Sequence, residues 1–149
     1  MKIVYLDTSA IIKRYVQESG SEVVAFLYSK AWLGEGKIAF SLWNIGEVLG
    51  VLDKYYKRGW LTSGDYELAR REFLGETLKM LRLRLLNIIP LKPPLIVESW
   101  KLVEKHRIHQ ADALQIASSK LAAAEEFYTA DKTLCEVASE EKLNTRCLV

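Results

Sequence analysis

Four carboxylates stand near the ends of predicted secondary-structure elements, and their placement suggests metal chemistry. Asp7 and Asp131 each come just after a short apolar run, while Glu47 and Asp112 lie in the early turns of predicted helices. In an open parallel sheet, ligands bind outside the carboxyl ends of the strands. Carboxylates crowded at that edge repel one another, and a divalent cation removes this cost. We therefore expect these four acids to bind Mg²⁺ or Mn²⁺.

Each acid also has an ordinary structural explanation. Asp7 and Asp131 can cap the helices that follow them, and Glu47 can complement a helix dipole. Asp112 is harder to explain, because it shares a face with Ile116 in a helix that is apolar over most of its circumference. No Lys or Arg stands at 108, 109, 115 or 116, so an acid on this face needs a distant partner, a metal or a proton.

The donor set indicates a hard cation that acts on phosphodiesters. Mg²⁺ and Mn²⁺ prefer carboxylate and water oxygens, and no Cys or His cluster favours zinc. A bound metal lowers the pKa of a water and neutralises charge on a phosphodiester. Thr8, Ser9 and Thr129 are placed to hydrogen-bond the metal ligands. These features predict hydrolysis of nucleic acid, RNA in particular, and they leave the number of metals open.

Strand-like and helix-like segments alternate along the chain, which predicts an α/β fold with a parallel sheet covered on both faces. The expected strands are 2–7, 37–41, 85–91, 126–129 and 145–149, and the expected helices are 9–17, 21–32, 42–57, 63–81, 95–106, 109–124 and 131–141. No Gly-, Ser- or Pro-rich linker divides the chain, so we expect one domain over 1–149. The helical pair between the second and third strands is longer than a crossover needs, which makes it a candidate dimer surface or lid.

Composition limits the alternatives without selecting one. The formal net charge is +2 and the isoelectric point is about 8.5, values that permit nucleic-acid binding without requiring it. Cys135 and Cys147 have no metal-ligand spacing, and we expect reduced thiols. No signal peptide and no membrane span is expected. Together these observations predict a cytoplasmic protein.

The four acids occur in segments that resemble those of the PIN-domain nucleases. The segments are Asp7-Thr8-Ser9 after a strand, Ser41-x-x-Asn44-x-x-Glu47, Ala111-Asp112-Ala113-Leu114 and Thr129-Ala130-Asp131. The likeness covers nearly the whole chain, and the compact length is similar to that of the VapC toxins of prokaryotic toxin–antitoxin pairs. Asn44 departs from the more usual Thr, and Leu134 departs from the aromatic residue that often follows the last acid.

The resemblance implies a set of properties that spacing alone does not give. The fold would be a three-layer α/β/α sandwich with strand order 3-2-1-4-5. The activity would be Mg²⁺- or Mn²⁺-dependent endoribonuclease cleavage, with Asp7, Glu47, Asp112 and Asp131 as the metal-binding catalytic acids. The protein would be a homodimer that a small VapB-type antitoxin holds inactive.

Three other functions are compatible with acids on an α/β scaffold. An aspartate-based phosphatase normally carries a second acid two residues after its nucleophile, where this chain has Ser9. A phospho-receiver would need adjacent acids near the first strand and a late lysine. An inactive PIN-like module that only binds RNA or protein remains open, although all four acids are present.

The middle of the chain carries basic and aromatic residues that could contact RNA. The basic residues are Lys54, Lys57, Arg58, Arg70, Arg71, Lys79, Arg82 and Arg84, and solvated helix faces are their commoner role. Tyr55, Tyr56, Trp60 and Tyr66 could stack on bases. Core or dimer contacts are the more frequent role of such aromatic residues, so the sequence leaves their function open.

Overall fold

A computed structural model describes residues 1–148 and contains, within that range, five strands and seven helices in alternation. In chain order they are β1 (Ile3–Leu6), α1 (Thr8–Tyr15), α2 (Ser21–Trp32), β2 (Lys37–Ser41), α3 (Leu42–Lys57), α4 (Ser63–Arg82), β3 (Leu86–Ile89), α5 (Pro93–His106), α6 (Gln110–Leu121), β4 (Glu126–Thr129), α7 (Lys132–Glu140) and β5 (Thr145–Cys147). The strands form one parallel sheet of order β3-β2-β1-β4-β5. The predicted α/β class and strand order are confirmed.

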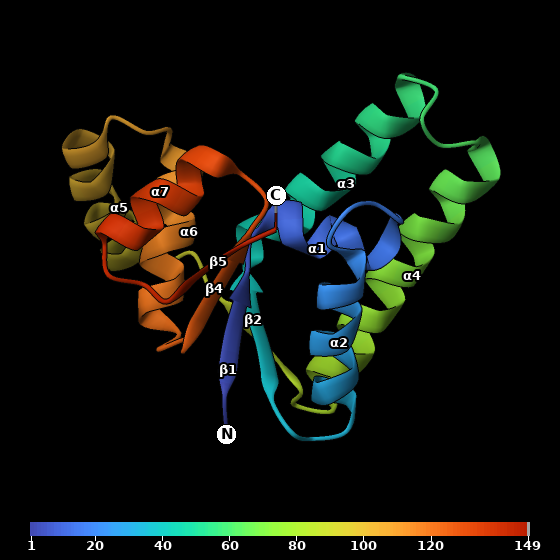
Figure 1. Ribbon diagram of the computed structural model, residues 1–149, viewed down its shortest axis with the longest axis horizontal. Coiled ribbons are helices and arrows are strands. Elements are labelled where there is room, and N and C mark those ends of the chain that lie inside the picture. Colours follow the sequence, from blue (N-terminus) through green and yellow to red (C-terminus); the bar gives the residue numbers. More distant parts are fainter. Residues whose placement is uncertain (149) are drawn as a thin grey trace.

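Helices cover both faces of this sheet, which makes the fold a three-layer sandwich. In Figure 1, α5, α6 and α7 lie on one side of the strands and α2, α3 and α4 lie on the other. Side chains of β1 alternate between the two layers: Val4 and Leu6 join the core formed with α1 to α4, while Tyr5 joins the core formed with α5 to α7. This alternation is the period-two pattern of a strand buried on both faces.

Polar side chains at the ends of strands start the helices that follow. Asp7 Oδ1 accepts a hydrogen bond from the Ala10 amide at 2.9 Å and so caps α1. Ser41 and Asn44 form a reciprocal capping box at the start of α3, and Asp131 Oδ1 accepts from the Leu134 amide at 3.0 Å at the start of α7. Each cap satisfies amides that a helix leaves unpaired in its first turn.

Several boundaries differ from the expected ones by one to three residues. The third strand ends at Ile89 because the next residue, Pro90, has no backbone N–H to donate to the sheet. Helix α5 begins early, at Pro93, whose fixed φ suits the first helical turn. Asn44, Val48 and Leu52 are the buried residues of α3, whereas Tyr56 is exposed. The expected last strand ends at Cys147 in the structure, and its final position, Val149, lies outside the described residues.

The expectation of two reduced thiols is wrong for this structure. Cys135 on α7 and Cys147 on β5 form a disulfide, with their Cα atoms 5.9 Å apart. The pairing depends on β5 lying beside β4 and against α7, a tertiary arrangement that the spacing of twelve residues does not reveal.

Within residues 1–148, no helix combines the length and the apolar character needed to cross a bilayer.

A half-buried ion-pair network ties three of the helices together on one face. The Arg14 guanidinium on α1 donates to both carboxylate oxygens of Glu76 on α4, at 3.0 and 2.8 Å. The Tyr15 hydroxyl and the Trp32 indole also donate to Glu76, at 2.8 and 2.9 Å. Burial favours a higher pKa for Glu76, but these hydrogen bonds outweigh it and hold the pKa below its ordinary value of 4.5.

We predict that Glu76→Gln lowers the free energy of unfolding by about 1–3 kcal/mol at neutral pH, because it removes charge from a carboxylate with four donors. The lowered pKa means that this stabilisation is present above pH 4.5 and is lost as pH falls through the folded-state value. Denaturant titrations at several pH values should therefore show the two proteins converging in acid. Glu72→Gln, an exposed change on the same helix, is the matched control. An equal loss in both variants would contradict the role of the network.

Candidate active site

The structure brings the four predicted acids to one hollow at the carboxyl ends of the strands. Asp7 follows β1 and Asp131 follows β4, and these two strands are paired neighbours. The chain reverses its direction of sheet growth between them, which is the position where open α/β sheets bind ligands. Glu47 reaches the hollow from α3 and Asp112 from α6, and all four acids line its volume of about 460 Å³.

The four carboxyl groups differ in exposure. Asp7 is only 4% exposed, Glu47 and Asp112 are half-buried, and Asp131 is exposed. Asp7 and Asp131 cap the helices that follow them, which is the ordinary structural role expected for both. Among the described residues, none of the four forms an ion pair with Lys or Arg. Capping therefore explains two positions, but the pocket still concentrates negative charge that no neighbouring cation neutralises directly.

Neutral donors surround the buried carboxylate of Asp7. The Ser9 hydroxyl donates to Oδ1 at 2.7 Å and the Thr129 hydroxyl donates to Oδ2 at 2.5 Å. The Ala10 amide donates to Oδ1 as well. Burial raises the pKa of Asp7 to about 6 because these donors offset the loss of water only in part, and the charge of Asp131 adds to the rise.

Asp112 stands where a buried helix opens into the hollow. The predicted burial of this helix is confirmed from Ala113 to Ser119, but Asp112 itself is half-buried because it lies in the first turn of α6. Burial, followed by the charge of Asp131, raises the pKa of Asp112 above its ordinary value, and His109 opposes the rise. Burial therefore disfavours the ionised form of Asp112, as expected for an acid on this helix. The penalty is smaller than full burial would impose.

A chain of hydrogen bonds orients Glu47 and ties together three helices. The Thr8 hydroxyl donates to Glu47 Oε1 at 2.7 Å, and Asn44 Nδ2 donates to Thr8 Oγ1 and to Gln115 Oε1 at 2.9 Å each. Asn44 and Gln115 are almost fully buried, and the Tyr5 hydroxyl also donates to Gln115 at 2.8 Å. Asn44, a departure from the residue expected at its position, thus has a defined structural role here. Gln115 was not singled out from the sequence, since a lone Gln in a helix carries no signal.

The donor set of the hollow suits a hard cation more than a softer one. Its acids offer carboxylate oxygens, and the raised pKa values of Asp7 and Asp112 mean that a nearby positive charge would favour their ionised forms. Within residues 1–148, no three Asp, Glu, His or Cys side chains gather closely enough to enclose an ion by themselves. Mg²⁺ usually keeps several waters and binds through one or two carboxylates, so the chemistry of these residues fits such an ion.

The lining of the hollow also includes basic and aromatic side chains. Lys54, Tyr55, Arg58 and Trp60 line the hollow from the end of α3 and the turn that follows, and Glu18 lines it from the α1–α2 connection. The sequence contained the basic and aromatic residues as candidates but gave no means of assigning them to the acid site. Their assignment depends on how far the α3–α4 hairpin extends past the sheet, which is a property of the tertiary structure.

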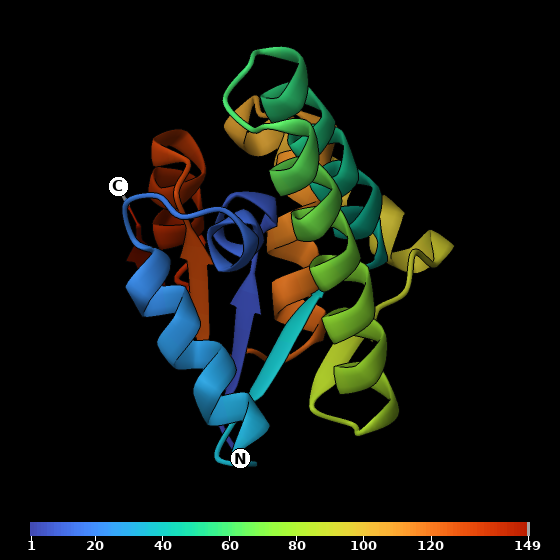
Figure 2. The same cartoon turned by 90° about the vertical axis from the view of Figure 1, so that its right-hand side faces the viewer.

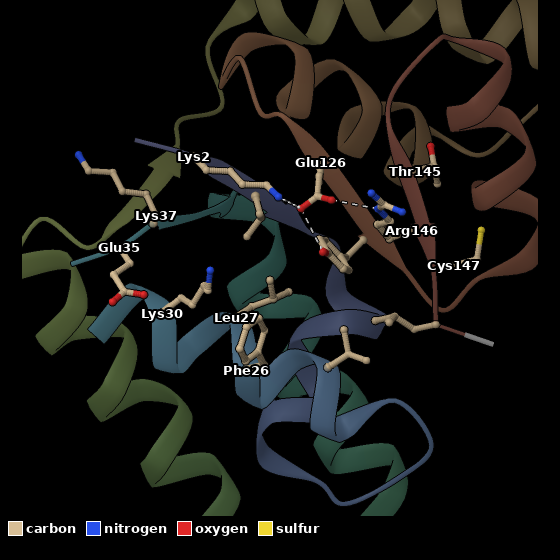
Figure 3. A pocket seen from close by; sticks show the side chains of 15 residues that line it. Lys2, Phe26, Leu27, Lys30, Glu35, Lys37, Glu126, Thr145, Arg146 and Cys147 are labelled. Carbon is tan, nitrogen blue, oxygen red and sulfur yellow. Dashed lines mark hydrogen bonds and ion pairs between the residues drawn. The ribbon is translucent and has the colours of Figure 1, made fainter. Parts of the chain in front are cut away.

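A larger hollow of about 690 Å³ lies between α2 and the sheet, toward the start of β4. Figure 3 shows Glu126 there with Lys2 and Arg146 directed toward its carboxylate, while Phe26 faces it from α2. Lys2 Nζ lies 2.7 Å from Glu126 Oε1, Arg146 Nε donates to Oε2 at 2.9 Å, and the Tyr128 hydroxyl donates at 3.1 Å. Glu126 is thus a satisfied structural carboxylate, which distinguishes this hollow from the one lined by Asp7.

We predict that Asp7→Asn stabilises the metal-free protein at alkaline pH. A folded-state pKa of about 6, raised from 3.8, means that the carboxyl contributes stability in acid and that this contribution is lost as pH rises from 3.8 through 6. The free energy of unfolding of the variant should therefore exceed that of the parent protein by about 1–3 kcal/mol at pH 8 in EDTA. This difference should shrink toward pH 4. Denaturant titrations measure it. A variant less stable than the parent at pH 8 would show that the charged cap matters more than burial.

Comparison with known proteins identifies the family of this chain. Comparison with curated proteins gave no match. Among solved structures, FitAcB from Neisseria gonorrhoeae is 18% identical with a TM-score of 0.66, covering 95% of each chain. Mycobacterium tuberculosis VapC20, a sarcin–ricin loop cleaving toxin, is 13% identical with a TM-score of 0.65, covering 96% of this chain and 98% of that one. VapBC2 from Rickettsia felis, bound to a promoter DNA fragment, is 16% identical with a TM-score of 0.62, covering 99% of each. These similarities establish the shared fold. Residues 4–140 match the family model of the PIN domain, and the chain therefore belongs to the PIN domain family.

Proposed function

We propose that this protein is a metal-dependent endoribonuclease and the toxin of a VapBC-type toxin–antitoxin pair. The observation that carries the proposal is the lining of one hollow by Asp7, Glu47, Asp112 and Asp131 at the carboxyl ends of a parallel sheet. Membership of the PIN domain family supports nuclease chemistry. Similarity to a structure described as a sarcin–ricin loop cleaving toxin supports RNA as the substrate.

The four acids would hold Mg²⁺ or Mn²⁺ in this hollow, one or two of them by direct contact and the others through the waters of the ion. When bound, the ion would supply a more acidic water and neutralise charge on the phosphodiester. The chain's own contribution is to fix the carboxylates before substrate arrives: Ser9 and Thr129 orient Asp7, and Thr8 orients Glu47. Groups held in this way need no reorganisation during the reaction, which is how such positioning contributes to rate.

The hydrogen bonds at Asp7 argue against the aspartate-based phosphatase. The residue two positions after Asp7 is Ser9, whose hydroxyl donates to Asp7 and accepts from the Ala130 amide at 2.8 Å. Both carboxylate oxygens of Asp7 already accept hydrogen bonds inside the protein, which suits a ligand of fixed orientation better than a nucleophile. The inactive binding module is the remaining alternative, and activity decides it.

We predict that the purified protein cleaves RNA with Mg²⁺ or Mn²⁺, and that EDTA, Asp7→Asn or Asp131→Asn each reduces the rate by about 100-fold or more. Asp53→Asn is the matched control, because Asp53 is an exposed acid of α3 that pairs with Lys57. Gel electrophoresis of labelled RNA fragments measures the rate. Cleavage that survives both EDTA and Asp7→Asn would exclude the metal-nuclease function. Complete inactivity of the wild-type protein on RNA would favour the binding module.

We also predict a small inhibitory partner, because one structure of this fold is described as a toxin–antitoxin complex from Klebsiella pneumoniae. A short reading frame beside this gene should encode a protein that co-purifies with the chain and abolishes RNA cleavage at equimolar concentration. Size-exclusion chromatography with light scattering measures the complex and also tests the expected homodimer. A neighbouring protein that binds without inhibiting would contradict the antitoxin assignment.

A further inference from the structure

The structure separates the four aromatic residues of the chain's middle segment into two pairs. Tyr56 and Tyr66 stack on one another, with ring centroids 5.1 Å apart and planes 23° apart, and join α3 to α4. Tyr55 and Trp60 contact each other with centroids 5.2 Å apart, and both line the hollow of the four acids. Only this second pair is therefore positioned to meet a ligand of the candidate active site.

The Tyr55–Trp60 pair lies at a structured turn. Gly59 adopts a left-handed conformation with φ of 76°, which lets the chain reverse after α3. The Trp60 amide donates to the Tyr55 carbonyl at 2.9 Å, so the two residues are linked through the backbone as well as through their rings. Figures 1 and 2 show this turn at the end of the α3–α4 hairpin, projecting beyond the strands.

Trp60 presents a large aromatic surface to solvent. Its side chain is 62% exposed, although burial of an aromatic ring is worth several kcal/mol to a folded protein. The Arg58 guanidinium lies 5.1 Å from the centroid of its ring. A fixed, exposed ring with an adjacent cation is the arrangement by which proteins stack unpaired nucleobases and hold the neighbouring phosphates.

The hollow is lined by charges of both signs. Lys54 and Arg58 line the hollow near Trp60, together with one acid, Glu18. Asp7 and Asp131 stand at the ends of the strands. A polyanion such as RNA would be repelled by the acids alone, so cations in the same lining are needed to keep a phosphate backbone in the hollow. The basic and aromatic side chains and the acids thus offer complementary contacts to the same RNA strand.

We propose that the exposed ring of Trp60, held by its contact with Tyr55 at an interplanar angle of 54°, stacks on one unpaired base of a single-stranded RNA, with Lys54 and Arg58 contacting its phosphates. The proposal rests on the ribonuclease function proposed above and assigns the part of the site that selects single-stranded substrate. Stacking accepts any base, because every base has a π-face. Selectivity at this site is therefore for unpaired nucleotides and not for one sequence.

Replacement of Trp60 tests the stacking contact. Trp60→Leu keeps an apolar side chain without a ring, and we expect it to weaken binding of single-stranded RNA by about 5- to 150-fold. Trp60→Phe keeps a π-face and should recover most of the affinity. Trp100→Leu is the matched control, since Trp100 is 52% exposed on α5 and outside the hollow. Fluorescence anisotropy of labelled RNA, in an Asp7→Asn background that prevents cleavage, measures these affinities.

Replacement of Lys54 tests the phosphate contact independently. Lys54→Gln should reduce the salt dependence of RNA binding by about 0.7 in the slope of log K against log salt concentration, the value for one phosphate contact to a single strand. Lys57→Gln is the control on the same helix, because Lys57 pairs with Asp53 and does not line the hollow. Equal slopes in the two variants would remove Lys54 from the site.

The outcomes separate this proposal from the ribonuclease function. If the wild-type protein cleaves RNA and Trp60→Leu binds it as tightly as Trp100→Leu, the stacking site is wrong and the nuclease function stands. If Trp60→Leu and Trp60→Phe weaken binding equally, the ring does not act by stacking. If the wild-type protein neither binds nor cleaves RNA, both proposals fail together. A raised KM with little change in kcat for Trp60→Leu would identify Trp60 as a binding residue outside the reacting atoms.

Discussion

Uncompensated negative charge at the carboxyl ends of β1 and β4 is the constraint on which the site depends. Asp7 is buried there among neutral donors from Ser9, Ala10 and Thr129, and no lysine or arginine in the described residues pairs with it. Neutral hydrogen bonds orient a carboxylate but replace only part of its hydration. The raised pKa of Asp7 reflects this incomplete replacement of its hydration. A protein selected only for stability would gain by placing a cation or an apolar residue at this position, so the retained cost favours a functional explanation.

The large apolar cores on the two faces of the sheet hold the elements together, but they do not set the directions of the acids. Burial of apolar surface is non-directional, whereas the route from Gln115 through Asn44 and Thr8 to Glu47 is a chain of directional contacts at 2.7 to 2.9 Å. This route joins α1, α3 and α6, so the helices that carry the acids share one fixed geometry. The Gln115 side chain takes part through its Oε1 atom alone, since its buried Nε2 amide has no hydrogen-bond partner among the described residues.

Local signals explain which parts of the fold were predictable from the sequence. β2 and β4 were predicted to the residue, because an apolar run at each ends in a hydroxyl side chain that stops the strand. Asp7 and Asp131 were identifiable because each follows such a run directly, and Asp112 because an acid is unusual on an apolar helix. The disulfide between Cys135 and Cys147 was missed, since their proximity is created by β5 joining the sheet beside β4. No periodicity in the sequence encodes that contact.

The aromatic side chains in the lining of the hollow could not be assigned to it from the sequence, because their position depends on how far the α3–α4 hairpin extends past the sheet. β2 has five residues and spans about 17 Å, whereas the 16 residues of α3 and the 20 of α4 span about 24 and 30 Å. A crossover between neighbouring strands needs only to cover the sheet, so these helices necessarily extend past one of its ends. Capping by Ser41 starts α3 at the carboxyl end of β2, which directs the excess length beyond the acids and not toward the opposite edge. The residues at the far end of α3 then line the same hollow as Asp7, although they are about fifty positions away in the chain. The capping box at Ser41 and a few helical turns beyond the sheet thus bring basic and aromatic side chains into the lining of the hollow that the acids occupy.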